Sequence, residues 1–344
     1  MALSTIRSLL SPNLDLVQID ATTRGTWEGT FTIRRAYRDR WLMRDFNPEM
    51  MRGLRPVLKR TRICHLQGWG EPLLNPHFFD LARIAAECGC TVTTAFSDGS
   101  LVDESAAREL TDCGLSQITL SISSLADQEN FERRGTKLSA AFQALDEIRR
   151  HRNTFGDKTP HINVLYNLHR SDLGELQKLP AIFQGLDVET LIINPLAFTP
   201  GVENEDQALV PGGPDELEEL RKKVRETTEL AEKRGMRVIA FAVNGGKKPP
   251  RCIEKLNSGM FVDSAGNVSP CIFSSPPIRG EAEYRFQGMD IPFPRLNFGN
   301  LEQASFRRIW HHEPYREFRR QFKKHGVPEA CAGCWRPYID LVQA

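Results

Sequence analysis

The stretch from Leu16 to Arg35 reads LVQIDATTRGTWEGTFTIRR and contains the first strand and the first long loop of the chain. Leu16, Val17 and Ile19 form an apolar, largely β-branched run, which ends at Asp20 and gives way to a polar loop that contains glycine. This pattern predicts a buried strand that leads into a loop at its carboxyl end. In α/β barrels such loops carry the chemistry, so we expect this loop to border the functional site.

The same alternation of an apolar strand and an amphipathic helix recurs through the first 243 residues. Strands are expected at 62–66, 90–96, 116–123, 161–167, 189–195 and 236–243, and helices at 47–61, 76–88, 103–113, 137–152, 172–184 and 215–234. Strands that alternate with helices at this spacing indicate parallel βα units with right-handed crossovers. The sequence therefore predicts an α/β fold, a partial (βα)6 TIM-type barrel, with a doubly wound open sheet as the competing architecture.

The composition changes after residue 243, where glycine, proline and scattered cysteine replace the regular pattern. One clear helix is expected here, at 305–324. A loop-rich segment of this size is typical of small domains whose order depends on a bound metal. We therefore predict two domains, a barrel at 1–243 and a cysteine-rich domain at 244–344.

Four cysteines of this tail have the spacing of metal ligands. Cys252 and Cys271 flank a predicted strand–turn–strand with Gly266 at the turn, and Cys331 and Cys334 form a Cys-x2-Cys pair. Four thiolates suit either tetrahedral zinc or a [4Fe-4S] cluster, and spacing alone does not separate these two metals.

The overall composition excludes several classes of partner. The 344 residues include 45 Lys and Arg and 44 Asp and Glu, a formal charge of +1, which argues against nucleic acid as a ligand. No apolar run reaches the length of a membrane span, and the amino terminus shows no cleavable signal. Eight cysteines without an export signal favour reduced thiols or metal ligands, so we expect a cytoplasmic location.

These features together resemble the radical S-adenosylmethionine (SAM)/SPASM family over nearly the whole chain. The matching stretches are 22–41, 62–76 and the cysteine tail. Within the family, the chain is most similar to the maturases of tungsten-cofactor aldehyde oxidoreductases and related peptide- or cofactor-modifying proteins. The resemblance implies a SAM-binding barrel followed by a SPASM/Twitch-like domain, which makes iron–sulfur the expected metal of the tail. No cysteine follows Cys334, so one auxiliary [4Fe-4S] cluster is implied, with zinc as the alternative.

The resemblance also implies a set of SAM-binding residues. The segment HLQGWGEP, at 65–72, is similar to the Gly-Gly-Glu motif that holds the amino group of SAM in the family. Polar residues at the ends of the next two strands, and an arginine soon after them, match positions that meet the methionine carboxylate or ribose. The implied SAM-binding residues are Gly68, Gly70, Glu71, Ser97, Asp98, Ser121, Ser123 and Arg133. No residue is assigned a catalytic role.

The chain departs from the family at the ligands of the radical-SAM cluster. The family holds this cluster with a Cys-x3-Cys-x2-Cys triad, and the matching positions here are Gly25, Gly29 and Thr32. None of the three offers a thiolate, so we expect the radical-SAM cluster and reductive SAM cleavage to be absent. The other four cysteines are expected at the opposite face of the barrel, as core or surface thiols: Cys64, Cys88, Cys90 and Cys113.

Three interpretations of this departure stay open at the level of sequence. The chain is a relative that uses its SAM pocket without radicals, a pseudoenzyme that serves as a partner or binding subunit, or a cluster-free variant of an active enzyme. The expected partners are a peptide, protein or small-molecule substrate and either an intact paralogue or a redox partner. Neither nucleic acid nor a membrane is expected to bind.

Overall fold

The computed structural model describes residues 13–25, 28–154, 159–244 and 252–342. Within these ranges, one ten-stranded sheet organises the molecule, and its strand order is β12-β7-β6-β5-β4-β3-β2-β1-β8-β9. A separate antiparallel hairpin consists of β10 (Glu283–Phe286) and β11 (Met289–Pro292). The predicted fold class, a mixed α/β protein with a mostly parallel sheet, is confirmed.

Seven consecutive strands of the described chain lie side by side in sequence order and run parallel. They are β1 (Leu14–Ile19), β2 (Thr61–Leu66), β3 (Thr91–Phe96), β4 (Leu115–Ile122), β5 (His161–Leu168), β6 (Val188–Pro195) and β7 (Arg237–Val243). Most of their apolar residues are buried, as expected of parallel strands that are covered on both faces, although Ile239 on β7 is exposed. Because the strands are parallel, all of their carboxyl ends open toward one rim.

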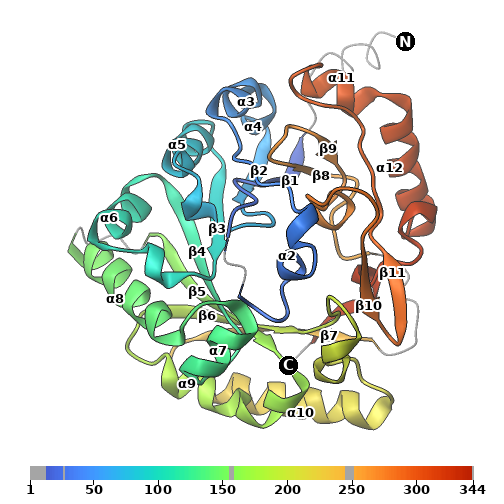
Figure 1. Cartoon of the computed structure of the whole chain (residues 1–344). Coiled ribbons are helices and arrows are strands. Elements are labelled where there is room, and N and C mark those ends of the chain that lie inside the picture. The colour runs from blue at the N-terminus through green and yellow to red at the C-terminus, as the bar shows by residue number, and fades with distance from the viewer. Residues whose placement is uncertain (1–12, 26–27, 155–158, 245–251, 343–344) are drawn as a thin grey trace.

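Helices cover the outer face of this curved sheet, whereas the short helix α2 (Ile33–Ala36) lies on its inner side (Figure 1). The outer helices are α5 (Phe78–Glu87), α6 (Glu104–Asp112), α8 (Leu138–Thr154), α9 (Leu179–Ile182) and α10 (Pro214–Glu232). Helix α7 (Asp127–Arg134) follows β4 directly and ends at Gly135, whose left-handed backbone closes the helix. None of the helices in the described ranges is long and apolar enough to cross a membrane.

Three of the expected helices are interrupted, each next to a proline. The helix expected at 47–61 is divided into α3 (Pro48–Gly53) and α4 (Arg55–Leu58), and that at 172–184 is a 3₁₀ segment at Arg170–Lys178 followed by α9. In the tail, α11 (Phe306–His311) and α12 (Glu313–His325) replace the single helix expected at 305–324. Pro56, Pro180 and Pro314 lie in the first turn of the later helix of each pair. Proline lacks a backbone N–H and restricts the residue before it, so a continuous helix cannot pass through these positions.

The cysteine-rich tail contributes strands to both edges of the barrel sheet. Strand β8 (Gly259–Val262) pairs parallel with β1, and β9 (Val268–Ser269) pairs antiparallel with β8. At the other edge, β12 (Ile339–Val342) pairs antiparallel with β7. The division of the chain at residue 243 stays a prediction, but the sheet crosses it, and the tail also has buried apolar side chains such as Phe261 and Tyr284.

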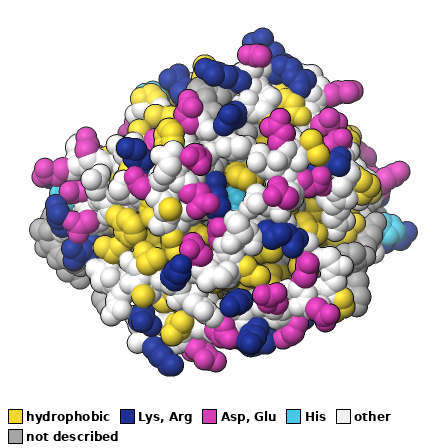
Figure 2. All heavy atoms as spheres, turned by 60° about the horizontal axis from the view of Figure 1, so that its bottom comes forward, with side chains coloured by type: hydrophobic (Ala, Val, Ile, Leu, Met, Phe, Trp, Pro, Cys, Tyr) yellow, Lys and Arg dark blue, Asp and Glu magenta, His cyan; other side chains and the backbone are white. Residues whose placement is uncertain are grey.

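Charged side chains of both signs intermingle on the face shown in Figure 2. Helix α12 has a cationic exposed side, but its acidic residues pair with these cations, as in the ion pairs of Arg320 with Glu313 and Glu317. This mixture is consistent with the nearly balanced composition of 45 basic and 44 acidic residues.

We predict that Phe261→Ala lowers the free energy of unfolding by about 3–5 kcal/mol, because the side chain is fully buried on β8. Urea unfolding of the anaerobically reconstituted protein measures this loss. Hydrogen exchange should also show reduced protection of β1, since β8 pairs with it. Leu341→Ala, at a largely exposed position on the other tail strand, is the control and should change stability by no more than about 0.5 kcal/mol. Unchanged protection of β1 in Phe261→Ala would show that the tail and the barrel unfold independently.

Candidate functional site

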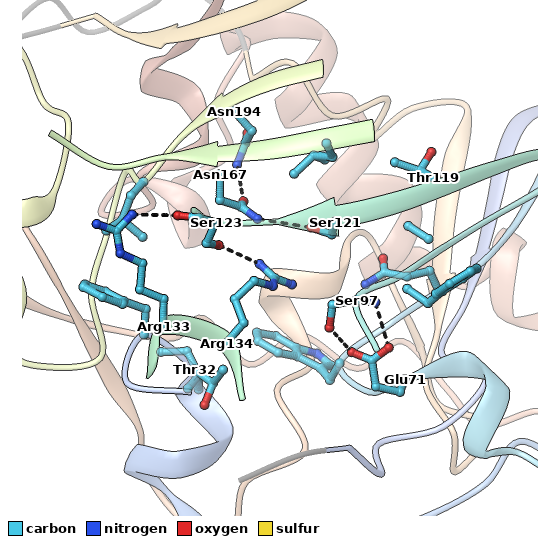
Figure 3. A pocket seen from close by; sticks show the side chains of 18 of the residues that line it. Thr32, Glu71, Ser97, Thr119, Ser121, Ser123, Arg133, Arg134, Asn167 and Asn194 are labelled. Atoms are coloured by element: carbon cyan, nitrogen blue, oxygen red, sulfur yellow. Dashed lines mark hydrogen bonds between the residues drawn. The ribbon is translucent and has the colours of Figure 1, made fainter. Parts of the chain in front are cut away.

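A cavity of about 580 Å³ opens at the carboxyl ends of strands β2 to β6. Its walls come from these strand ends, from the loop that precedes α2, from the carboxyl end of α7 and from Trp335 in the tail. This volume suits a small organic molecule, and the position is the one at which α/β barrels place their active sites. The close view in Figure 3 shows side chains from these separate elements converging on the cavity.

Polar side chains form a hydrogen-bonded row across one wall of the cavity. Asn194 on β6 donates to Asn167 Oδ1 on β5 at 3.3 Å, and Asn167 Nδ2 in turn donates to Ser121 Oγ on β4 at 3.1 Å (Figure 3). Asn167 and Asn194 are register partners on neighbouring parallel strands, whereas Ser121 is opposite Leu165, two residues before Asn167. The row offers neutral amide and hydroxyl groups to a ligand. Of these residues, Ser121 was expected to bind SAM.

Glu71 connects the end of β2 to the end of β3. Its carboxylate accepts hydrogen bonds from the backbone N–H groups of Ser97 at 2.8 Å and Asp98 at 3.2 Å, and also from the Ser97 hydroxyl. Asp98 itself accepts from Ser100 N at 3.1 Å, and it is not among the residues that line the cavity. Seven of the eight predicted SAM-binding residues therefore line one cavity, and Asp98 does not.

The glycines of the Gly-Trp-Gly-Glu turn lie directly against the end of β1. A Cβ atom on Gly68 would lie 1.9 Å from Asp20 Oδ1, and one on Gly70 would lie 2.3 Å from the backbone oxygens of Thr22 and Arg24. Neither position has room for a side chain. Close packing of the turn against the first strand is therefore enough to require glycine at both positions, whatever the ligand.

Arg133 and Arg134 are neighbours in α7, but their guanidinium groups have different surroundings. Arg133 forms a buried ion pair with Asp172 and a second ion pair with the partly exposed Glu129, and it donates to the Ser123 carbonyl. Its donors are thus largely committed within the protein. Arg134 Nη1 reaches Ser123 Oγ at 3.3 Å on the cavity wall (Figure 3). Of these two arginines, only Arg133 was assigned a ligand-binding role from the sequence, and that role stays a prediction.

Each of the three positions that match the family's cysteine triad has another structural role. A Cβ atom on Gly25 would lie 2.1 Å from Nη1 of Arg34, so the guanidinium group fills the space of a side chain there. A Cβ atom on Gly29 would lie 2.6 Å from the backbone of Arg134. Thr32 caps α2 and donates to the Gly29 carbonyl at 2.7 Å. The residues of this loop do not fit a [4Fe-4S] cluster, because they supply no thiolate and leave no room for one at the two glycines.

The loop is held in this arrangement by backbone hydrogen bonds to α7. Thr30 N donates to the Glu132 carbonyl at 2.9 Å, and Phe31 N donates to the Arg133 carbonyl at 3.3 Å. The carboxyl end of a helix leaves such carbonyls without partners inside the helix, so the loop satisfies them. Gly29 permits this close approach.

Arg34, the second residue of α2, is buried and was not predicted from the sequence. Its Nη2 donates to the Trp69 carbonyl at 2.5 Å, and its Cζ lies 5.5 Å from the centroid of the Trp41 ring. Burial lowers the pKa of Arg34, the charges of Glu71 and Asp20 oppose this effect, and Arg134 adds to it. An arginine keeps its charge even so. In the sequence, the signal for Arg34 is a cationic side chain two positions after Thr32, the last of the three positions predicted to match the cysteine triad.

The four tail cysteines form one electrostatically coupled group. Burial raises the pKa of the Cys331 thiol to about 12, and the neighbouring Cys334 and Cys252 act in the same direction. Burial also raises the pKa of Cys271, again with contributions from Cys331 and Cys252. Arg336 and Glu254 form an ion pair of 2.5 Å beside the group. Three of these thiols are buried and that of Cys271 is partly exposed, and the set, with a cation next to it, fits a thiolate-ligated metal centre.

The distances between the four tail cysteines are relevant to whether the tail binds a single metal ion or a [4Fe-4S] cluster. Among the described residues, no three Cys, His, Asp or Glu side chains converge closely enough to hold one metal ion. A [4Fe-4S] cluster does not require that convergence, because its four thiolates bind four different iron atoms.

The remaining cysteines lie away from the cavity. Cys64 is buried within β2, Cys88 and Cys90 lie between α5 and the start of β3, and Cys113 lies between α6 and the start of β4. The starts of parallel strands are at the opposite end of the barrel from the cavity. Burial raises the pKa of the Cys64 thiol, and the nearby Cys90 and Cys88 act in the same direction.

Comparisons with known proteins agree with this architecture. The SPASM iron-sulfur cluster-binding domain family matches residues 252–335. A tungsten-containing aldehyde ferredoxin oxidoreductase cofactor-modifying protein from Pyrococcus furiosus is 24% identical over 285 residues, which cover 82% of this chain and 76% of that protein.

Two solved structures share the fold over almost the whole chain. SuiB of Streptococcus suis bound to SAM has a TM-score of 0.64 and 12% identity, over 98% of this chain and 74% of SuiB. The protein anSMEcpe with bound AdoMet and a peptide has a TM-score of 0.62 and 17% identity, over 95% of this chain and 88% of that one.

The chain has a radical SAM/SPASM-type fold. The predicted resemblance is thereby confirmed for the fold, and the SPASM match includes the four tail cysteines. The correspondence of Gly25, Gly29 and Thr32 to the family's cysteine triad stays a prediction.

Asp20, at the end of β1, is the buried acid nearest to this loop. Burial raises its pKa to about 8, although Trp69 N donates to Oδ1 at 2.9 Å. Asp263 acts in the same direction as burial. The carboxyl group therefore holds its proton at neutral pH.

We predict that Asp20→Asn becomes progressively more stable than the wild type as pH rises from 5 to 8. The folded-state pKa exceeds the unfolded value, so the wild type is stabilised most at low pH and loses this contribution as pH rises toward 8. The slope approaches about 1.4 kcal/mol per pH unit for a single group. Asparagine imitates the protonated acid and has no such dependence. Urea unfolding at pH 5, 6.5 and 8 measures the difference, and a difference that is constant with pH would contradict the assignment.

Proposed function

We propose that this protein is a radical SAM/SPASM-type protein that binds a small molecule at the barrel mouth, carries one auxiliary [4Fe-4S] cluster in its tail, and does not cleave SAM reductively. One observation carries the proposal. The guanidinium group of Arg34 fills the space beside Gly25, at the first of the three positions that would ligate the radical-SAM cluster. Protein atoms thus fill the space beside Gly25 in the absence of a cluster.

The packing around Gly25 indicates that the surrounding residues are adapted to a loop without a cluster, rather than that the cluster ligands were simply lost. Removing a cysteine side chain alone would leave a void, which costs stability unless the surroundings fill it. Here a buried arginine fills it, and Gly29 lets the loop approach the α7 backbone. Arg34, Gly29 and the Thr32 cap support one another. This arrangement supports a pseudoenzyme or a non-radical protein over an enzyme variant that lacks only its cluster.

The tail thiols Cys252, Cys271, Cys331 and Cys334 would hold the auxiliary cluster, which supplies one-electron transfer when bound. Trp335 lines the barrel cavity and follows Cys334 directly, so the proposed cluster site and the small-molecule pocket share a wall. Electron exchange with a redox partner, or service as a subunit beside an intact paralogue, is compatible with this placement.

A second candidate function is SAM binding without radical chemistry. It is favoured by the seven predicted SAM-binding residues that line one cavity, Glu71 and Ser97 among them. SuiB and anSMEcpe, which share the fold, were solved with SAM bound. Calorimetry of SAM binding, with product analysis of the same sample, distinguishes the two candidate functions. Binding of SAM together with formation of a SAM-derived product other than 5′-deoxyadenosine would favour the second candidate.

We predict that anaerobically reconstituted protein contains about four irons per chain, as one cluster with four cysteine ligands requires. Cys331→Ala with Cys334→Ala should abolish the iron, because half of the ligands are lost. Cys113→Ser, at a buried thiol outside the tail, is the control and should retain it. Iron and acid-labile sulfide analysis measures the content. Zinc in place of iron would contradict the auxiliary cluster, and about eight irons would contradict the proposed state of the loop.

We further predict that dithionite-reduced protein forms no 5′-deoxyadenosine from SAM, measured by chromatography. A variant with Gly25→Cys, Gly29→Cys and Thr32→Cys should also form none, because two of the new side chains meet Arg34 and the α7 backbone. Parallel iron analysis of the variant is its control for cluster uptake. Formation of 5′-deoxyadenosine by the wild type would refute the proposed function.

A further inference from the structure

The strands themselves line the barrel cavity mainly with neutral polar side chains. In α/β barrels, bulky branched residues such as valine, isoleucine and leucine usually fill the interior. Among the described strand residues that line this cavity, only Leu165 and Ile192 are of this kind, and none is Asp, Glu, Lys or Arg. The neutral polar residues that the strands contribute are His65, Gln117, Thr119, Ser121, Asn167 and Asn194.

Three of these residues, His65, Gln117 and Thr119, form what we call the cavity floor. His65 on β2, Thr93 on β3 and Gln117 on β4 are register partners on adjacent strands, so they lie at one level of the sheet. Nδ1 of His65 lies 2.8 Å from Oγ1 of Thr93. Gln117, Thr119 and Ser121 alternate along β4 and therefore face the same side. At the usual rise of a parallel strand, Gln117 lies about 13 Å below Ser121.

The cavity floor is distinct from the residues that were predicted to bind SAM. Those that line the cavity lie at or beyond the carboxyl ends of the strands, as Glu71, Ser97 and Ser123 do, or close to such an end, as Ser121 does. None of the three floor residues is among them. A group that reaches the floor would therefore meet a separate set of side chains.

Two residues of the cavity floor have hydrogen-bonding groups that the protein does not use. Within the part of the chain that the structure describes, the side chains of Gln117 and Thr119 make no hydrogen bond, although both line the cavity. By contrast, Ser121 and Asn167 higher on the wall are joined at 3.1 Å (Figure 3). Polar groups inside a protein are satisfied by water or by a ligand when no protein group pairs with them.

The chemistry of the cavity floor favours an uncharged ligand group. Gln117 and Thr119 carry no charge, and burial lowers the pKa of His65 to about 4, so its ring is neutral at pH 7. A charged ligand group would find no counter-ion on this floor, and burial of an unpaired charge is costly. A glutamine amide presents an N–H donor and a carbonyl acceptor side by side. An amide group of a ligand presents the complementary pair.

The mouth of the cavity suits a flat ligand body. Trp41 and Trp69 line it, with 6.2 Å between their ring centroids, and Phe198 and Trp335 line it from the tail side, with 5.0 Å between theirs. All four follow the carboxyl ends of strands or belong to the tail, so they lie above the floor. Aromatic rings pack well against the faces and edges of another planar group.

We infer that this cavity binds an uncharged small molecule with a flat body, whose amide group reaches the floor and is held there by Gln117 and Thr119. The inference deepens the proposed function and rests on it, because it names the class of the small molecule that the barrel binds. It assigns a binding role to a polar interior that the barrel fold does not itself require.

The test uses the anaerobically reconstituted full-length protein and three probes of nearly equal shape: benzamide, acetophenone and benzoate. Acetophenone keeps the carbonyl group but lacks the N–H donor, and benzoate replaces the amide by a charged carboxylate. Ligand-observed NMR titration at pH 7 gives the three dissociation constants. Benzamide should bind at least roughly fivefold more tightly than either of the others, as expected when a partner of a buried hydrogen-bonding group is lost.

Two variants locate the binding site. Gln117→Leu keeps most of the side-chain volume without the amide, and Thr119→Val is isosteric without the hydroxyl. Each should weaken benzamide binding at least roughly fivefold, and Gln117→Leu should also reduce the preference for benzamide over acetophenone. Gln303→Leu is the matched control: this glutamine is exposed in the tail and does not line the cavity, so affinity should not change. Circular dichroism checks the fold, and if Gln117→Leu does not fold, Thr119→Val decides.

Absence of benzamide binding to the wild type would overturn the inference, as would benzoate or acetophenone binding as tightly as benzamide. Unchanged benzamide affinity in the folded floor variants would overturn it as well. None of these results bears on the absence of reductive SAM cleavage, which product analysis tests separately. Conversely, detection of 5′-deoxyadenosine would refute the proposed function even if benzamide binds as expected.

Discussion

The contact between Arg34 and Gly25 determines what the mouth of this barrel can do. The guanidinium group of Arg34 fills the space that a side chain at Gly25 would need, and its own burial requires partners, which the Trp69 carbonyl and the Trp41 ring supply. The same contact depends on the path of the loop, which Gly29 permits and the α7 carbonyls fix. In the proposed function, this one packing arrangement takes the place of a radical-SAM cluster.

The rest of the fold makes this arrangement possible. Parallel strands bring Glu71, Ser121 and Asn167 to one rim, where the loop closes over them. The tail extends the sheet at both edges through β8 and β12, and it places the Cys331–Cys334 pair next to Trp335 on the cavity wall. In this radical SAM/SPASM-type fold, the barrel cavity and the cysteine-rich tail thus share a wall at Trp335.

Much of the fold could be predicted from the sequence because its signals are local. The apolar strands from β1 to β7 were found through periodicity and turn residues, and the tail thiols through spacing. The helix boundaries at Pro56, Pro180 and Pro314 were missed, although each proline is a readable stop signal.

The contents of the site were harder to predict, because they depend on contacts between distant segments. Thr30 meets Glu132 across about a hundred residues of sequence, and this contact holds the loop before α2 against the end of α7. The choice of Arg133 over Arg134 could not be settled from sequence, since both belong to one short helix and Asp172 is far along the chain. The glycines at 68 and 70 matched a ligand-binding motif, yet their packing against β1 alone requires them.

An iron-edge anomalous difference map from crystals of the anaerobically reconstituted protein, grown with SAM, would test the central claim most directly. The account predicts a single cluster peak, enclosed by Cys252, Cys271, Cys331 and Cys334, and ordinary light-atom density for the Arg34 guanidinium group beside Gly25. A second iron peak at the loop from Gly25 to Thr32 would contradict it.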